Sequence, residues 1–254
     1  MSFKRNGKNV IAVDDQQDIL ELSKLFLERF EDDLSVDTTT DPEEVLEMVE
    51  EDQYDGVLSD FDMPEMTGVE LLEEVREFDE DIPFILYTGK GSEEVAAEAV
   101  NHGVTDYFRK EAGSDHYQMI AQSMVGAIEG YRDRAEKEVF EAVVEYSENP
   151  ILITDTESSI VYVNQAVLDA TGYDRDELLG ENPRMLNSEV HGDELFESMY
   201  RALENGEVFE IDDMTNVDKN GDEYLHDQQV IPITLGRNCP EFYAAISDLK
   251  EAEI

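Results

Sequence analysis

Short apolar runs alternate with amphipathic stretches along the first 112 or so residues of the chain. Between the runs, apolar residues recur every three or four positions, which is the period of a helix with one buried face. Such an alternation of strands and helices predicts an α/β unit with a doubly wound, parallel, five-stranded sheet. Sheets of this kind carry their functional groups at the carboxyl ends of the strands. The expected strands are residues 10–13, 34–36, 57–58, 83–87 and 106–108.

From about His116 the pattern changes to that of one long helix. Its apolar positions recur at alternating spacings of three and four: Tyr117, Ile120, Met124, Ala127, Tyr131 and Ala135. The first turns are expected to pack on the sheet, whereas the part after Gly130 has no sheet left to cover. That part is a candidate helical linker or short coiled coil. A solvated helix lying on its own domain is the open alternative.

A third pattern follows Pro150. Two strand-like runs precede a helical middle that ends near Glu204, and three further strands follow it. This order predicts an α+β unit, with a five-stranded antiparallel sheet and helices on one of its faces. The expected organisation is a first domain over 8–114, a helix and linker over 115–147, and a second domain over 148–250.

The charge of the chain is strongly one-sided. Sixty-four acidic residues against eighteen basic ones give a formal net charge of −46. An acidic tail that binds a basic partner would concentrate this charge in one block, but Asp and Glu are spread over nearly every segment. The distribution favours a surface adapted to high salt, as in halophiles, because salt screens repulsion between like charges. Direct binding of nucleic acid is not expected, because it requires clustered Lys and Arg.

Targeting signals and disulfides add little. No apolar run approaches the ~20 residues that span a bilayer, and no signal-peptide pattern follows the basic N-terminus. The single cysteine, Cys239, excludes an internal disulfide and fits a reducing compartment. We therefore expect a cytoplasmic protein without a membrane segment.

Chemistry-bearing residues fall at the ends of four of the expected strands. Asp14 and Asp15 close the first strand and Asp60 closes the third, so parallel pairing would bring three carboxylates together. Such a cluster of hard oxygen ligands suits Mg²⁺. An ordinary acidic loop is the alternative in so acidic a chain. Thr88 and Lys110, which end the fourth and fifth strands, favour the functional interpretation because they add a hydroxyl and an ammonium to the same edge.

Residues 9 to about 112 resemble the receiver domain of two-component response regulators, which has a flavodoxin-like fold. The motifs that carry the resemblance are Val-Asp-Asp at 13–15, Asp-Phe-Asp-Met-Pro at 60–64 with Gly68, Tyr-Thr-Gly at 87–89, and Asp-Tyr-Phe-Arg-Lys at 106–110. Glu111 departs from the family, which usually has proline after the lysine, and this puts the local turn geometry in doubt.

The resemblance implies a role for each site residue. Asp60 would be the phosphoacceptor, with Lys110 and Thr88 contacting the phosphoryl group. Mg²⁺ would be held by Asp14, Asp15, Asp60 and the backbone carbonyl of Asp62. Tyr107 corresponds to the switch aromatic of the family, and packing in the core is its alternative role.

Residues from about 140 to 250 resemble a PAS domain. The motifs lie at 160–164, 171–173, 177–180, 182–184, 218–221 and 246–248. The resemblance predicts the fold but leaves the ligand unknown, and an empty or dimerising domain is an equal alternative. Cys239 does not stand where a flavin-binding PAS domain would need its reactive cysteine. His191 lies in a stretch where many PAS domains without haem have histidine, so we assign no cofactor-binding residue.

Together these features predict phosphorelay signal transduction, in a protein of halophilic archaeal type. A histidine kinase or phosphotransfer protein would be the partner, and a homodimer through the linker and the PAS domain is a candidate assembly. No stand-alone metabolic activity is expected; the receiver would catalyse its own phosphorylation and dephosphorylation. One alternative is the sensory N-terminal part of a truncated hybrid histidine kinase, since no transmitter domain is recognisable here. A non-catalytic interaction module is the other.

Overall fold

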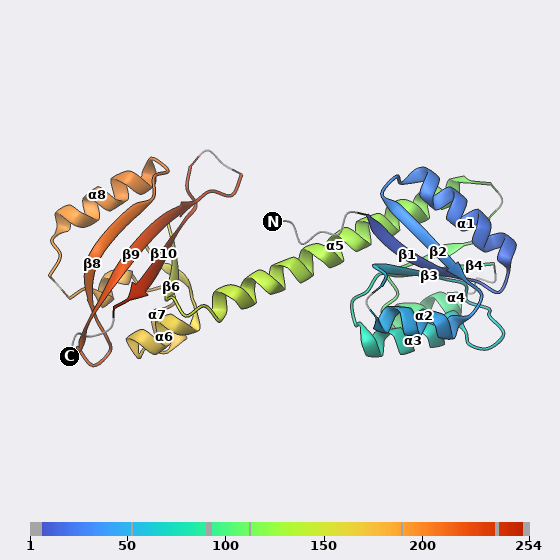
Figure 1. Cartoon of the computed structure of the whole chain (residues 1–254), viewed down its shortest axis with the longest axis horizontal. Coiled ribbons are helices and arrows are strands. Elements are labelled where there is room, and N and C mark those ends of the chain that lie inside the picture. The colour runs from blue at the N-terminus through green and yellow to red at the C-terminus, as the bar shows by residue number, and fades with distance from the viewer. Residues whose placement is uncertain are drawn as a thin grey trace. The chain divides into compact units, whose positions relative to one another are not determined.

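The computed structural model describes residues 7–51, 53–89, 93–111, 113–188, 190–236 and 239–250. For residues 93–95 it describes the backbone only. The chain divides into two compact units, Met1–Lys137 and Glu138–Ile254, and one long helix, α5 (Asp115–Glu145), contributes to both (Figure 1). Each unit is described by itself below.

The first unit is built on a parallel sheet of five strands in the order β2-β1-β3-β4-β5. The strands are β1 (Lys8–Val13), β2 (Leu34–Thr39), β3 (Gly56–Ser59), β4 (Phe84–Thr88) and β5 (Asp106–Arg109). The helices that connect them are α1 (Gln17–Phe30), α2 (Pro42–Glu50), α3 (Gly68–Phe78) and α4 (Glu93–Asn101), and α5 follows β5. The doubly wound parallel sheet predicted from the sequence is confirmed.

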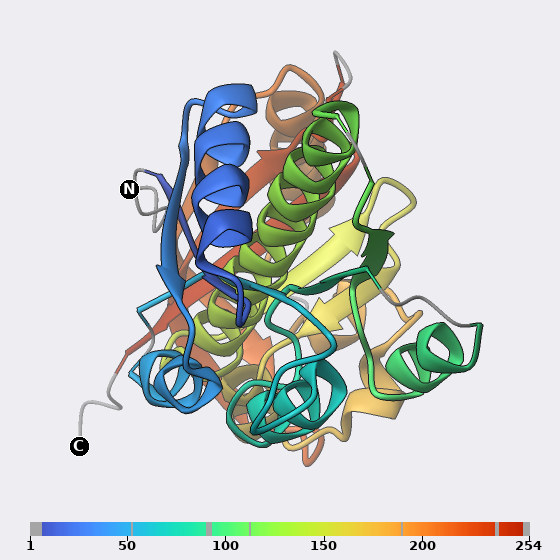
Figure 2. The ribbon, with the colours of Figure 1, turned by 90° about the vertical axis from the view of Figure 1, so that its right-hand side faces the viewer.

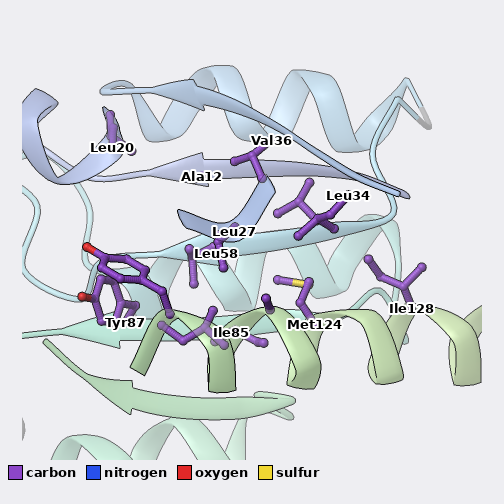
Figure 3. Close-up of a cluster of buried hydrophobic side chains, with 14 residues drawn as sticks. Ala12, Leu20, Leu27, Leu34, Val36, Leu58, Ile85, Tyr87, Met124 and Ile128 are labelled. Carbon is purple, nitrogen blue, oxygen red and sulfur yellow. The ribbon is translucent and has the colours of Figure 1, made fainter. Parts of the chain in front are cut away.

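Successive side chains of a strand point to opposite faces of the sheet, so the core of this unit forms two clusters, one on each face. In β1, Val10 and Ala12 point to one cluster, while Ile11 and Val13 point to the other. The first cluster joins the strands to α1 and α5, which lie side by side over one face (Figures 2 and 3). The second cluster joins them to α2 and α3, and it also contains Ala99 of α4. Burial on both faces explains the continuous apolar strand sequences.

Local capping fixes where the connecting helices begin. The Asp41 side chain accepts a hydrogen bond from the amide of Glu43, and Pro42 occupies the first turn of α2. At the start of α3, Thr67 and Glu70 form a reciprocal capping box.

The long helix α5 packs on the first unit over its N-terminal half. Its buried residues there are His116, Tyr117, Ile120, Ala121, Met124 and Ile128. The predicted packing of the first turns is thus confirmed. Beyond Gly130 the helix is still attached, because Tyr131 donates to Asp79 at 2.6 Å and Arg132 pairs with Asp55 at 2.7 Å. Polar contacts at the edge where the strands begin therefore hold this part of the helix, in place of the apolar contacts that the sequence lacks there.

The second unit is an antiparallel sheet in the order β7-β6-β10-β9-β8 with helices packed on it (Figure 1). The strands are β6 (Ile151–Asp155), β7 (Ile160–Val163), β8 (Phe209–Val217), β9 (Glu223–Ile233) and β10 (Phe242–Leu249). The helices are α6 (Gln165–Thr171), α7 (Arg175–Leu178), the 3₁₀ helix η1 (Pro183–Leu186) and α8 (Asp193–Glu204). This is the predicted α+β arrangement.

Two small apolar clusters hold these helices on the sheet. Val167 of α6 and Leu178 of α7 pack with Leu152 of β6, while Leu203 of α8 packs with Val230 and Tyr243. None of the described helices has the length and apolar character to cross a membrane.

Candidate functional site

Three carboxylates meet where two neighbouring strands of the first unit end. Asp14 follows β1 and Asp60 follows β3. Val13 and Ser59 are paired in register, and the Asp60 amide donates to the Val13 carbonyl at 2.9 Å. This register brings one oxygen each of Asp14, Asp15 and Asp60 within 4.8 Å of one another. The carboxylate cluster is the one expected from the strand ends.

Lys110 reaches the same cluster from the other side. It follows β5, and its amide donates to the carbonyl of Thr88, the last residue of β4, at 2.8 Å. Its ammonium Nζ lies 2.5 Å from Asp14 Oδ2 and 3.0 Å from Asp60 Oδ1. Four strand ends thus place acids, hydroxyl and ammonium at one edge of the sheet.

The side chains in the interior of the site are shielded from solvent. Asp14 is 3% exposed, Asp60 5% and Thr88 0%, whereas Asp15 is exposed and forms the rim. Burial raises the pKa of Asp14, against the opposing effects of hydrogen bonds from Lys110 and from the Gln16 amide. A raised carboxyl pKa means that the negative charge of Asp14 is incompletely compensated by the protein alone.

A divalent cation fits this set of residues. The buried Asp60 Oδ1 accepts no hydrogen bond from the described residues, although it lies 3.0 Å from Lys110 Nζ. Three carboxylates face one ammonium, so negative charge is in excess. Hard, oxygen-rich, negatively charged sites of this size are typical of Mg²⁺.

The loop after β3 is held tightly against Asp60. Asp62 lies in this loop with an exposed side chain. The amide of Gly68, the first residue of α3, donates to the carbonyl of Phe61 at 2.9 Å. A Cβ at Gly68 would lie 2.2 Å from the backbone oxygen of Asp60, so only glycine permits this approach.

Tyr107 lies in β5 with its ring against the second core cluster. Its hydroxyl is buried without a hydrogen-bond partner among the described residues, and burial raises its pKa. A buried hydroxyl that makes no hydrogen bond is costly. The ring of Tyr107 thus packs on the core, and its role as a switch stays a prediction.

Two aromatic residues next to the site were not assigned a role from the sequence. The ring of Tyr87 lies under the Lys110 ammonium, and its hydroxyl is 2.6 Å from His116 Nε2. His116 is buried, at 9% exposure. Its place just before the buried positions Tyr117 and Ile120 was the signal that could have indicated burial.

The second unit contains a cavity of about 90 Å³ between α8, the 182–187 segment and the sheet. Apolar side chains line most of it, and Thr154, Asn216 and Gln228 add polar groups. The volume is below the ~300 Å³ typical of pockets for drug-sized ligands. Neither Cys239 nor His191 lines this cavity, and Cys239 is exposed.

Comparison with known proteins matches each unit separately. Residues 10–122 match the family model of the response regulator receiver domain, and residues 148–251 match that of the PAS domain.

Curated relatives match the first unit. The two-component response regulator ARR10 from Arabidopsis thaliana is 34% identical over 121 residues, which is 47% of this chain and 21% of the relative. The response regulator SaeR from Staphylococcus epidermidis is 31% identical over 102 residues, 40% of this chain and 43% of the relative. The chain therefore spans about a fifth to two fifths of the length of these relatives.

Solved structures also resemble one unit at a time. A response regulator receiver domain protein from Clostridium thermocellum is 26% identical, with a TM-score of 0.45, over 49% of this chain and 97% of that one. The PAS domain of a Colwellia psychrerythraea protein is 17% identical, with a TM-score of 0.42, over 44% of this chain and 95% of that one.

Proposed function

We propose that this chain, in which a response regulator receiver domain is followed by a PAS domain, works in phosphorelay signal transduction. In this proposal Asp60 accepts a phosphoryl group from a histidine kinase or phosphotransfer protein. The phosphorylated receiver then passes a conformational change through α5 to the PAS domain. We place the protein in the cytoplasm, with no contact to nucleic acid or membrane.

The chemical step is a displacement at phosphorus. A carboxylate oxygen of Asp60 forms a bond to phosphorus while the phosphorus–nitrogen bond of a phosphohistidine breaks, and the electron pair leaves with the imidazole nitrogen. Negative charge on the transferred oxygens must be neutralised during this step. Lys110, which already contacts Asp60, supplies one positive charge. Thr88, buried at the end of β4, would offer its hydroxyl to the new phosphoryl group.

The cation site belongs to the same proposal. Asp14, Asp15, Asp60 and the backbone carbonyl of Asp62 would hold Mg²⁺, which when bound would neutralise the phosphoryl oxygens. Asp14 keeps its place in the site through the hydrogen bond from the Gln16 amide at 3.0 Å. The carboxylate cluster thereby has both a fixed geometry and an excess of charge.

The observation that carries the proposal is the Lys110 ammonium within 3.0 Å of a buried Asp60 oxygen, beside two further acids. Acetyl phosphate with Mg²⁺ tests it, because it phosphorylates without a kinase. Intact-mass measurement should show the gain of one phosphoryl group in the wild type, lost when EDTA removes the metal.

Two variants make this test specific. Asp60→Asn should gain no mass, since the amide cannot act as the nucleophile. Asp62→Asn is the matched control: its exposed side chain is outside the proposed ligand set, so phosphorylation should persist. Mass gain in Asp60→Asn, or no gain in the wild type, contradicts the proposal, and the latter result would favour a non-catalytic interaction module.

For the output, we propose that Thr88 and Tyr107 respond first and that α5 carries the change onward. Asn164 supports this route at the far end of α5, because its buried amide donates to the carbonyls of Val144 and Asn149 at 3.0 Å each. Its oxygen also accepts from the Ile151 amide at 2.9 Å. The last turn of α5 is thus tied directly to the first strand of the PAS sheet.

The PAS domain would act as a sensor or as a dimerisation element. The small cavity favours a compact ligand or none over a large cofactor. The end of α5 exposes Phe140 (51%) and Val143 (64%), and the residue that follows the helix, Tyr146, is 83% exposed. These apolar side chains support a homodimer through the linker. Analytical ultracentrifugation in molar salt tests it: Val143→Glu should shift a dimer to monomer, and a monomeric wild type would exclude the dimer.

A further inference from the structure

The Lys110 ammonium lies over an aromatic ring that the phosphorylation motif does not explain. Its Nζ is 5.7 Å from the centroid of the Tyr87 ring. A cation at this distance from a ring face is attracted by the quadrupole of the ring, and the attraction grows when water is excluded. The Lys110 side chain is 14% exposed and Tyr87 is 3% exposed, so little water separates them.

The Tyr87 ring is itself held in place from α5. Its hydroxyl lies 2.6 Å from His116 Nε2, and the two rings stack with centroids 5.5 Å apart. Tyr117 adds a second ring at 5.6 Å, on the side that continues to Phe26 of α1. Figure 3 shows Tyr87 at the end of the core cluster, beside the first turns of α5. The Tyr87 ring is therefore held by two aromatic neighbours on α5, His116 and Tyr117.

The Tyr87–His116 hydrogen bond joins two uncharged groups. Burial, followed by a hydrogen bond with Tyr117, raises the pKa of Tyr87, and burial lowers the pKa of His116. The Lys110 ammonium therefore lies over the π face of a neutral ring. Neither a charged phenolate at Tyr87 nor a charged imidazolium at His116 adds to this interaction.

We infer that Tyr87, held by His116, is a positioning residue that keeps the Lys110 ammonium over Asp14 and Asp60. This inference rests on the proposed phosphoryl transfer to Asp60 and deepens it. Lysine is a flexible side chain with four rotatable carbons. The ring restricts it to the side of the site where it can meet both the acceptor oxygen and the incoming phosphoryl group.

This contact is separate from the proposed response of Thr88 and Tyr107. Tyr87 points into the first core cluster, which includes α1 and α5, whereas Tyr107 packs on the second cluster across the sheet. The position of Lys110 is thereby linked to the first turn of α5 through the contacts of Tyr87 with His116 and Tyr117.

The test compares two substitutions at one position under acetyl phosphate and Mg²⁺. Tyr87→Leu removes the ring and should lower the maximal phosphorylation rate about fivefold, while the Mg²⁺ concentration for half-maximal rate stays unchanged. Tyr87→Phe keeps the ring face and should retain the rate within about twofold. In a Lys110→Ala background, Tyr87→Leu should cause no further loss, because the two residues act as one unit.

A spectroscopic measurement covers variants that phosphorylate too slowly. The ε-methylene protons of Lys110 should show an upfield ring-current shift in the wild type and in Tyr87→Phe, and lose it in Tyr87→Leu. An equal loss of rate in both variants, a changed Mg²⁺ dependence, or the absence of the ring-current shift in the wild type would overturn the inference. If the wild type takes up no phosphoryl group but shows the shift, the proposed function fails while the contact between Lys110 and Tyr87 stands.

Discussion

Gly68 shows how a single residue without a side chain shapes the site. The start of α3 comes so close to the Asp60 backbone that a Cβ would lie 2.2 Å from its oxygen and 2.7 Å from Leu86 Cδ2. Both neighbours belong to the buried core of the sheet. An added methyl group must therefore displace the end of β3 or the start of α3.

We expect Gly68→Ala to destabilise the receiver by about 2 kcal/mol and to slow phosphorylation of Asp60. Gly126→Ala is the matched control, because nothing lies within 4 Å of a Cβ at this exposed position of α5. That change should stabilise the helix by up to about 1 kcal/mol. Urea denaturation with hydrogen-exchange readout measures both, and equal effects of the two substitutions would disprove the steric argument.

His226 is a comparable case in the PAS domain. It is 1% exposed in the middle of β9, stacked on Tyr224 at 5.5 Å, and neither ring nitrogen has a hydrogen-bond partner among the described residues. Burial lowers its pKa from 6.5 to about 4, against the opposing effect of Asp227, and nearby His191 adds a smaller lowering effect. The folded PAS domain therefore holds a neutral imidazole that the unfolded chain would protonate more readily.

The pH dependence of PAS stability follows from this difference. Between pH 6.5 and about 4, His226 is protonated in the unfolded state but stays neutral in the folded state. The free energy of unfolding therefore decreases as the pH falls through this range. The loss attributable to His226 should approach about 3 kcal/mol. In thermal unfolding, His226→Leu should show a weaker pH dependence than the wild type, with His102→Leu in the receiver as the control. Identical pH profiles for wild type and His226→Leu would contradict the assignment.

At the scale of elements, α5 is held by different forces along its length. Apolar packing fixes its first half, and then Lys8–Glu129, Tyr131–Asp79 and Arg132–Asp55 attach it to the edge of the sheet opposite the carboxylate cluster. Arg132 also donates to the Gly7 carbonyl at 2.8 Å. These ties make the start of the linker part of the receiver, so the length able to move independently is shorter than the sequence pattern suggests.

The two arginines of this segment offer a matched comparison. Arg132 and Asp55 are only 16% and 10% exposed, so Arg132→Ala should destabilise the receiver by about 2 to 3 kcal/mol. The buried Asp55 carboxylate would keep the hydrogen bond from the Asn9 amide but would lose its counter-ion. Arg134 and Asp81 are 54% and 52% exposed, and Arg134→Ala should cost less than about 0.5 kcal/mol. Hydrogen exchange of β1 and β3 amides in the full chain reports both values. Comparable losses in the two variants would show that burial does not control these pairs.

For the whole molecule, charge dominates. A net charge of −46 on 254 residues opposes compaction at low ionic strength. At about 1 M salt the Debye length falls to about 3 Å, so repulsion between exposed carboxylates is screened, whereas buried pairs such as Arg132–Asp55 are screened much less. Salt adaptation thus stays a prediction that one measurement can decide.

We expect the midpoint of thermal unfolding to rise between dilute buffer and molar KCl. Sodium chloride at the same concentration is the control and should act alike, because screening does not depend on which monovalent cation is used. Equal stability in dilute buffer and in molar salt would rule out salt adaptation as the reason for the charge.

The sequence by itself determined the order of strands and helices and the chemistry at the strand ends. Local periodicity indicates each element, and right-handed parallel connections then bring residues 14, 15, 60, 88 and 110 to one edge. Gly68 is part of the sequence motif, but only the structure shows why glycine is required there, because the Asp60 carbonyl leaves no space for a side chain.

Only the tertiary structure decided which side chains touch across long stretches of sequence. Lys110 meets Asp14 over a separation of 96 residues, and the contacts of Tyr87 with His116 and of Arg132 with Asp55 depend on the same close packing of distant segments. Periodicity encodes which face of an element is buried, but it carries no information about distances between elements. The cluster of Asp14, Asp15 and Asp60 could therefore be predicted from the chain, whereas the contact between Lys110 and the Tyr87 ring could not.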